Sequence, residues 1–444
     1  MAGTYLLRTL TSTGNRKLWT WSAWIKKAIP DGTEMGLFGL YEDGANYFRI
    51  RYKPDQRLSI DNVEGNTTTM SLILGIDHRD VSGWYHLVVR YDSAQSTDSN
   101  RVKIYVNGVL QTEFQAATYP SQNANTYFPV NALPLNVGRT TNNKYFDGSM
   151  SHIHFTDGYA YDASTFGSTD ATTGQWKINT SPSVTYGTNG FFIFKDNGAK
   201  TDQSGNSNNF SEEGTPGIVS NTQDCPSNVF ATWNPLQATT AATYAFEAGN
   251  TRMSVNDAAV FSLGATLAAT TGKYYMEMKW VQQGGNGSWG MIPIDTDINN
   301  RPRNAGVGWN QGDNAPWLLG SIVSGSWGGS IGTNDIIQLA MDLDNGAFYF
   351  GKNDVWLNSG NPTSGSSKTG AVDFSGTSLF GEQLTFAIGK GASGTDGWNA
   401  NFGNGYFEQT AVADNSTATA STPGVFNYAV PTGYQPLSTK GLNA

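Results

Sequence analysis

Four tryptophans in the second half of the chain are the residues best suited to hold a ligand. They stand among Gly, Asn, Asp and Ser at positions 289, 309, 317 and 327. A tryptophan on a loop offers a flat apolar ring that loses little entropy on binding, which suits a sugar ring or a protein partner. The first two fit buried strands, whereas the last two fit either a core or a loop. We therefore expect a ligand site at Trp317 and Trp327, with Asp313 and Asn314 beside them.

Two histidines have a spacing that could serve a metal ion. His152 and His154 are two positions apart on an expected strand, so their imidazoles would point the same way. The alternative is that both face solvent while Ile153 and Phe155 pack beneath them. Two ligands are too few without a third group, so we expect no metal site. His78 stands in a polar turn and is expected in solvent.

Signals for nucleophilic or phosphate chemistry are weak. No Gly-x-Ser-x-Gly elbow stands at a strand–helix junction. The run 284–287 is Gly-rich but lacks the Lys of a phosphate-binding loop. Cys225 precedes Pro226 without a nearby His, so we expect an inert thiol.

The bulk composition indicates two or three domains rich in strands and turns. The chain has 444 residues with 12% aromatic and only 14% charged residues, against about 25% charged in a typical globular chain. A net charge of −9 without a Lys/Arg cluster argues against nucleic-acid binding and against an anionic membrane surface. A single cysteine fits assembly in a reducing cytoplasm. The first residues lack a signal-peptide pattern, and no apolar run is long enough for membrane insertion.

Apolar alternation predicts strands through most of the chain. The runs 101–106 and 335–344 place apolar residues at every second position. Asn-Gly follows each run, at 107–108 and at 345–346. Asn-Gly between strands predicts a hairpin, because a type I′ turn needs positive φ at both central residues. Positions 274, 276, 278 and 280 are likewise apolar. No segment sustains a helical period, so we expect an all-β chain of sandwiches.

Five pieces of the first 165 residues occur in the order of a known family. They are Trp21–Lys26, Gly83–Val89, Ile104–Gly108, Val137–Arg139 and Phe146–Phe155. Together they resemble the LamG, or concanavalin A-like, family. The resemblance implies an antiparallel β-sandwich of the jelly-roll type, with His86 as a packed structural residue. Such domains often hold calcium through rim Asp and Asn. Asp43, Asp61 and Asn62 are of that type but form no spaced set, so we assign no calcium site and no other cofactor.

The next stretch resembles a pattern of marine phage proteins. Its pieces are Asp157–Gly167, Tyr186–Phe192, Asp202–Phe210 and Cys225–Pro235. In the phage proteins this run joins a LamG-like domain to the rest of the chain, which implies a virion protein. The run Val430–Leu437 is similar to endings of phage structural proteins.

The second half resembles the SPRY family, a sandwich of the same broad superfamily. The matching pieces are Gly272–Glu277, Gly306–Trp309, Asp342–Phe350, Lys352–Asn353 and Asn401–Gly403. This resemblance implies binding of proteins or sugars through loops, without catalysis. The expected organisation is a LamG-like sandwich at 1–167, an irregular connector at 168–242, a SPRY-like sandwich at 243–408 and an extended tail at 409–444. Within the connector, residues 190–195 are a candidate strand of the first domain.

Glycan hydrolases of the concanavalin A-like fold carry Glu-x-Asp-x-x-Glu on one strand, so that paired carboxylates share a face. This sequence lacks the triplet. Glu277 stands alone between two methionines, and Asp342 and Asp344 precede a turn without a following Glu. We therefore expect no enzyme activity.

The combined expectation is a non-enzymatic phage protein on the virion, in a tail or capsid fibre, that binds host-surface polysaccharide. Its partners would be other virion proteins and host glycan, and it would form a homo-oligomer such as a trimer. One alternative is a purely structural decoration or adaptor protein that binds other virion subunits. A second alternative is a polysaccharide depolymerase.

Overall fold

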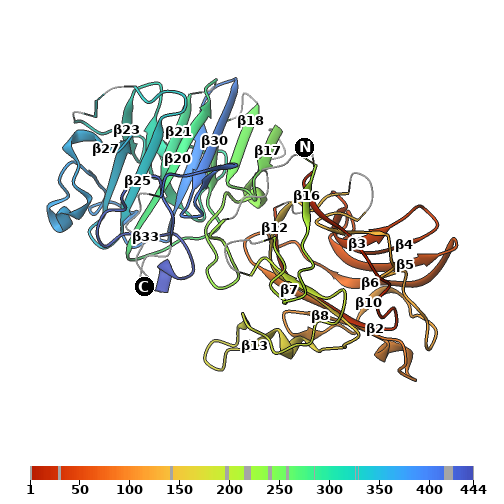
Figure 1. The fold of residues 1–444 in the computed structure, drawn as a ribbon. Helices are drawn as coiled ribbons and strands as arrows, with labels where there is room; N and C mark the ends of the chain where they lie inside the picture. The colour runs from red at the N-terminus through yellow and green to blue at the C-terminus, as the bar shows by residue number, and fades with distance from the viewer. Residues whose placement is uncertain are drawn as a thin grey trace. The chain divides into compact units, whose positions relative to one another are not determined.

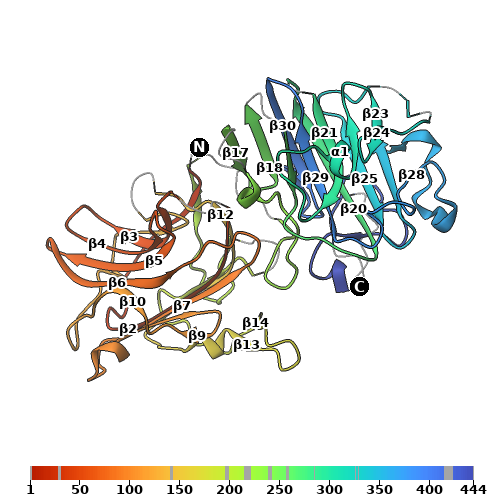
Figure 2. The same ribbon diagram turned by 180° about the vertical axis from the view of Figure 1, so that it is seen from behind.

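The computed structural model separates the chain into two compact units, Met1–Asn221 and Thr222–Ala444 (Figures 1 and 2). The structure describes residues 3–28, 32–140, 144–195, 200–214, 222–238, 243–256, 260–284, 286–325, 327–328, 330–414 and 424–443. Nearly all regular structure is β, and the strands of each unit form two main sheets. The expected all-β fold is confirmed. No helix in these ranges is long and apolar enough to cross a membrane.

The first unit is a sandwich of an eight-stranded and a six-stranded sheet, counted over the described residues. The first sheet has the order β10 (Phe114–Thr118), β6 (Thr67–Asp77), β5 (Arg57–Glu64), β4 (Tyr47–Tyr52), β3 (Met35–Tyr41), β11 (Pro134–Val137), β1 (Tyr5–Thr9) and β16 (Ser211–Glu213). The second has the order β15 (Phe191–Ile193), β12 (Gly148–Asp157), β2 (Leu18–Lys27), β7 (Tyr85–Asp92), β8 (Val102–Val106) and β9 (Val109–Leu110). All these pairings are antiparallel. Alternate residues of both sheets, such as Trp21 and Phe38, meet in one core.

The second unit is also a sandwich. Its larger sheet has the order β17 (Thr243–Glu247), β18 (Arg252–Asn256), β30 (Thr395–Asn401), β20 (Lys273–Gln282), β25 (Ile336–Asp342), β26 (Ala347–Lys352) and β27 (Val355–Trp356), with β28 (Val372–Asp373) on β26 and β33 (Gln435–Pro436) on β20. The smaller sheet has the order β19 (Phe261–Gly264), β29 (Leu384–Lys390), β21 (Gly287–Pro293), β22 (Val307–Asn310), β23 (Ala315–Leu318) and β24 (Ser321–Ile322). The pairing of β33 with β20 is parallel. The remaining elements are α1 (Pro302–Ala305), the pairs β13 (Gly167–Thr169) with β14 (Trp176–Ile178) and β31 (Tyr406–Phe407) with β32 (Thr410–Ala411), and 3-10 turns at Asp98–Asn100, Ala163–Thr165, Pro235–Gln237, Leu357–Ser359, Pro362–Ser367 and Gly441–Asn443.

Both Asn-Gly hairpins form. Asn107 and Gly108 have φ of 48° and 80° between β8 and β9, as a type I′ turn requires. At the second hairpin the last paired residues are Asp342 and Ala347, so the loop has four residues, of which Gly346 has φ of 69°. Tyr274, Met276, Met278 and Trp280 all lie in the core of the second unit, as the alternation of β20 predicts.

The segment expected as a connector carries ordered structure. Its residues 191–193 form β15 and pair with β12, at the position of the candidate strand 190–195. β13 and β14 pair with each other, and β16 pairs with β1. The division between the units falls after Asn221, inside the segment 168–242.

The C-terminal tail packs on the second unit instead of leaving it. Phe426, Tyr434 and Leu437 are buried, and Gln435 and Pro436 pair with β20. These apolar residues stand in an otherwise polar run, and the prediction of an extended tail at 409–444 does not include their packing.

Candidate ligand-binding sites

Glycines on the outer face of the smaller sheet of the second unit make room for α1. A Cβ at Gly308 would lie 2.3 Å from the backbone nitrogen of Arg303, and one at Gly389 would lie 2.6 Å from Cδ of Pro302. The alternate residue Trp309 points into the core. The short helix therefore lies directly on the sheet and fixes Arg303 above the neighbouring strands.

Arg303 and two of the predicted site residues form one cluster. The Arg303 guanidinium lies 4.6 Å from the ring centre of Trp317. Trp317 Nε1 donates to Asp313 Oδ2 at 3.0 Å, and Arg303 Nη1 lies 3.5 Å from the same oxygen. Asn310 Nδ2 also donates to it. Trp317 is half-buried on β23, so part of its indole remains accessible. The structure thus brings Trp317 and Asp313 together, as predicted.

Asn314 serves the turn between β22 and β23. Its φ is 49°, a left-handed conformation that Asn tolerates better than most residues. Its backbone nitrogen donates to Gln311 O at 3.3 Å. The side chain is exposed, and the described contacts tie it to the turn and not to Trp317.

Trp327 does not belong to this site, and its prediction as a ligand-binding residue is wrong. Its side chain is 4% exposed and lies edge-on to Phe350 in the core of the second unit. Its Nε1 donates to Val323 O at 3.1 Å. The surrounding Gly and Ser resemble a loop in composition, but the chain folds the indole inward.

The hairpin of β23 and β24 adds exposed apolar side chains that sequence reasoning missed. Ile322 pairs with Trp317 and is 57% exposed, and Leu319 is 38% exposed. Leu319 has φ of 46°, which is costly for a leucine. Its backbone nitrogen donates to Gly306 O at 2.9 Å, which holds the turn. We call Trp317, Leu319, Ile322, Arg303 and Asp313 together the Trp317 edge.

Arg301 lies beside the Trp317 edge and is itself 7% exposed. Burial lowers the pKa of its guanidinium below the usual 12.5; the charge of Arg303 lowers it further, and that of Asp313 raises it. Its Nη1 atom is buried without a hydrogen-bond partner in the described part of the chain. Asn310 Oδ1, on the side chain whose nitrogen donates to Asp313, is also buried without a hydrogen-bond partner among the described residues.

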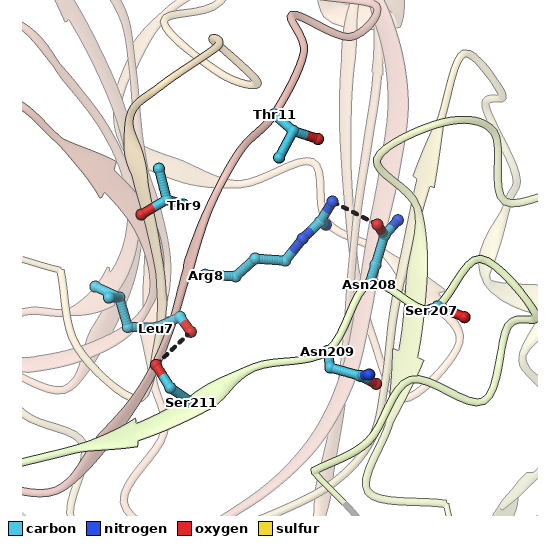
Figure 3. A pocket seen from close by; sticks show the side chains of 8 residues that line it. All are labelled: Leu7, Arg8, Thr9, Thr11, Ser207, Asn208, Asn209 and Ser211. Atoms are coloured by element: carbon cyan, nitrogen blue, oxygen red, sulfur yellow. Dashed lines mark hydrogen bonds between the residues drawn. The ribbon is translucent and has the colours of Figure 1, made fainter.

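The first unit has a polar groove of about 470 Å³ at the end of β1 (Figure 3). It is lined by Leu7, Arg8, Thr9, Thr11, Ser207, Asn208, Asn209 and Ser211. Arg8 Nη2 donates to Asn208 Oδ1 at 2.5 Å, and Ser211 Oγ donates to Leu7 O at 3.1 Å (Figure 3). These two hydrogen bonds join β1 to Asn208 and Ser211, at and just before the start of β16.

Two carboxylates accept backbone hydrogen bonds around β15 and in the segment that precedes β16. Asp202 accepts from the backbone nitrogens of Phe192 and Asn208 at 2.9 and 2.8 Å. Asp157 accepts from the backbone nitrogens of Asn15 and Asn189 at 2.6 and 3.0 Å. The sequence pieces that resemble phage proteins therefore contain the contacts that fasten this segment to the sandwich.

The paired histidines lie under this segment instead of in solvent. His154 is 2% exposed, stacks on Phe192 at 3.9 Å between ring centres and hydrogen-bonds to Tyr186 at 2.9 Å. Burial, with smaller contributions from neighbouring histidines, holds its pKa well below 6.5. The alternative of solvent exposure is wrong, although Ile153 and Phe155 do pack beneath.

His86 is a packed residue, and its tautomer does not suit it to activate Ser22 as a nucleophile. Trp176 Nε1 donates to its Nδ1 at 2.9 Å, so Nε2 carries the proton and donates to Ser22 Oγ at 2.9 Å. A general base would have to accept from the hydroxyl. Burial lowers the pKa of His86 to about 3. His78, expected in solvent, is also buried and hydrogen-bonds to Tyr52 at 2.9 Å.

Three of the acidic residues considered for catalysis or calcium, Glu277, Asp342 and Asp61, bind other groups of the protein. Glu277 is fully buried and accepts from the backbone nitrogens of Asn427 and Tyr428 at 2.7 and 2.8 Å. Asp342 lies 3.0 Å from the ammonium of Lys273. Asp61 accepts from two arginines and two serines on the outer face of the eight-stranded sheet.

One family model matches part of the first unit. Residues 4–164 match a family model described as the concanavalin A-like lectin/glucanases superfamily. No curated protein matches the sequence significantly.

The solved structures that match have low identity and low TM-scores. The SPRY domain of human HERC1 is 14% identical, with 38% of this chain and 96% of that chain covered and a TM-score of 0.29. A SAP-like pentraxin from Limulus polyphemus is 13% identical, with 40% and 86% covered and a TM-score of 0.29. The TRIM65 PSpry domain is 11% identical, with 38% and 91% covered and a TM-score of 0.29. Likenesses of this size support no functional inference. Over residues 4–164, however, the first unit is similar to concanavalin A-like lectins and glucanases.

Proposed function

We propose that this chain is a non-enzymatic phage structural protein that binds host-surface polysaccharide on the virion, in a tail or capsid fibre. The observation that carries the binding role is the Trp317 edge. Exposed apolar atoms of Leu319 and Ile322 adjoin the indole and an arginine–carboxylate pair. Sugars present apolar ring faces surrounded by hydroxyls, and this combination of surfaces matches both.

A single shallow edge of this kind binds weakly. Several copies in a symmetric homo-oligomer, such as a trimer, would raise the avidity without new contacts. Most soluble oligomers are symmetric homo-oligomers, and the proposal includes such an assembly.

Two further observations support the proposal. The run Asp157–Pro235, which resembles phage proteins, includes the Asp157 and Asp202 contacts that fasten its segment to the first sandwich. The absence of catalysis is supported by Glu277 and Asp342, since their carboxylates are committed to backbone amides and to Lys273. A hydrolase needs such groups free beside the substrate.

A glycan array carrying capsule and lipopolysaccharide extracts tests the binding role with the full chain. The proposal predicts retention of at least one polysaccharide without release of new reducing ends. A cryo-EM map of whole particles tests the location, where the expected result is density for both sandwiches outside the shell or tail tube. Reducing-end release would contradict the non-enzymatic role, and absence from the particle would contradict the virion role.

An adaptor role is a second candidate, and one feature favours it. β9 is the end strand of the six-stranded sheet of the first unit, and its Val109 and Leu110 are 64% and 41% exposed. An exposed apolar edge is suited to pairing with another subunit. Docking to a capsid or tail protein, with no glycan retained on the array, would favour this role over polysaccharide binding.

A further inference from the structure

The Trp317 edge and its neighbour Arg301 hold more positive charge than the protein neutralises. Arg303 shares the Asp313 carboxylate with Trp317 Nε1 and with Asn310 Nδ2. Arg301 forms no ion pair in the part of the chain that the structure describes. Two guanidinium groups therefore depend on one carboxylate, in a chain whose net charge is −9.

The Arg301 side chain is packed against the protein surface beside Gly391. A Cβ at Gly391 would lie 1.8 Å from Arg301 Nη1, so the guanidinium rests directly on this glycine. The side chain is 7% exposed, and Nη1 is buried without a hydrogen-bond partner among the described residues. Buried charges in proteins are normally paired, and an unpaired one needs a water, an ion or a ligand.

An unpaired acceptor accompanies this donor. Asn310 Oδ1 is buried without a partner, while the amide nitrogen of the same side chain is held by Asp313. A hydroxyl group can donate to such an oxygen, whereas an oxyanion cannot. The cluster therefore fits a ligand that has both an oxyanion and hydroxyl groups.

We propose that Arg301, Arg303, Asn310, Asp313 and Trp317 bind a saccharide that carries an oxyanion, either a uronate carboxylate or a sugar phosphate, in preference to a neutral sugar. This inference rests on the proposed polysaccharide-binding function and names its ligand class. Arginine supplies parallel N–H donors that match the two oxygens of a carboxylate or phosphate. Asn310 Oδ1 accepts from a hydroxyl, and the half-buried indole contacts the ring.

Isothermal titration calorimetry on the full chain tests the proposal with matched pairs of probes. One pair is trigalacturonate and its methyl ester, and the other is glucose 6-phosphate and glucose. We expect the charged member of at least one pair to bind about tenfold tighter, since one charge-assisted pair of hydrogen bonds is worth at least that factor. The pair that shows the preference distinguishes carboxylate from phosphate.

Variants then locate the effect. Arg301→Gln and Arg303→Gln should each remove most of the preference, and Arg301→Lys should keep part of it. Arg79→Gln is the matched control, because Arg79 is 72% exposed in the first unit. Melting temperatures identify any variant that fails to fold. The comparison of charged and neutral probes uses the wild-type chain, so it tests the proposal even if a variant does not fold.

The outcomes separate this inference from the function on which it rests. If charged and neutral members bind alike, or if the array retains only neutral glycans, the anion preference is overturned and polysaccharide binding stands; water then occupies the position beside Arg301. If neither the array nor any probe shows binding, both proposals are overturned.

Discussion

Trp317 and Trp327 show how the surroundings of an indole decide what it can do. Trp317 has a guanidinium on its ring and a carboxylate at Nε1, and it remains half-buried. Trp327 has an aromatic ring against it and a backbone carbonyl at Nε1, and it is 4% exposed. The first arrangement leaves apolar surface for a ligand, whereas the second contributes to the core.

Paired alanine substitutions should therefore separate binding from stability. Trp327→Ala should lower the free energy of unfolding of the second unit by about 3–5 kcal/mol, the usual cost of removing a large aromatic side chain from a core. Trp317→Ala should lower it by about 1 kcal/mol, because less of its surface is buried. Urea denaturation followed by circular dichroism measures both. Equal losses for the two variants would contradict the assignment of Trp317 to the surface.

The sequence identifies the tryptophans as candidates but does not separate buried ones from surface ones, because Gly, Asn and Ser flank both kinds of position. Arg301 and Arg303 carry no local signal of a site. They become neighbours of Trp317 only because Gly308 and Gly389 let α1 lie on the sheet. Gly389 lies on β29 (Leu384–Lys390), about eighty residues after α1, and no spacing rule encodes that contact.

At the scale of elements, Glu277 on β20 anchors the C-terminal segment. Besides the two backbone nitrogens, it accepts from Tyr275 Oη at 3.0 Å and Asn401 Nδ2 at 3.3 Å. Burial raises the pKa of Glu277 to about 7, against the opposing effect of these four hydrogen bonds. Phe426, packed against Tyr275, completes the attachment.

This raised pKa predicts a pH dependence of the second unit. In the unfolded chain the carboxyl loses its proton near pH 4.5, whereas in the folded chain it does so near pH 7. Its contribution to stability is therefore fully present below pH 4.5 and is lost as pH rises through 7, by about 3 kcal/mol in total. Glu277→Gln cannot titrate, so the difference in unfolding free energy between the variant and wild type should change by that amount between pH 4.5 and 8. Asp313→Asn is the surface control. A difference that stays constant with pH would contradict the assignment.

We expect the described residues 200–210, which precede β16, to stabilise the first unit, and we call them the clasp. Asp202→Ala removes the acceptor of the Phe192 and Asn208 backbone amides, and it leaves buried donors unpaired. We expect a loss of about 2–4 kcal/mol in the unfolding free energy of the first unit. Asp98→Ala, in an exposed 3-10 turn, is the control. A change within about 0.5 kcal/mol for Asp202→Ala would show that the segment is not needed for the sandwich.

Strands are the elements that the sequence predicts well, because period-2 alternation and Asn-Gly turns are local properties. The clasp and the docked C-terminal segment are not local. They depend on single Asp and Glu side chains that accept hydrogen bonds from backbone nitrogens distant in sequence. Asp157, for example, accepts one from the backbone nitrogen of Asn15. From composition, such segments are predicted to be polar and irregular. Their backbone is indeed irregular, but they pack against the sandwiches.

At the scale of the whole molecule, the two units should respond to pH in opposite directions. His86, His154 and His78 are buried in the first unit, and burial lowers the pKa of each. The unfolded chain binds protons at these sites below about pH 6.5, whereas the folded unit does not, so its stability is lost as pH falls from 6.5 toward 4. The second unit gains stability over the same range through Glu277.

Differential scanning calorimetry of the full chain from pH 8 to pH 5 measures this contrast. We expect the transition of residues 1–221 to move to lower temperature and that of residues 222–444 to move to higher temperature. Expression of each unit alone assigns the transitions. Transitions that move together would contradict the division of buried titratable groups between the units.

The proposed function depends above all on saccharide binding at the Trp317 edge. The most direct measurement is the affinity of the best array polysaccharide for wild type and for Trp317→Ala, taken at a temperature where both are fully folded. The proposal predicts a loss of at least about tenfold, as for the removal of an aromatic anchor. Unchanged affinity in Trp317→Ala would contradict it.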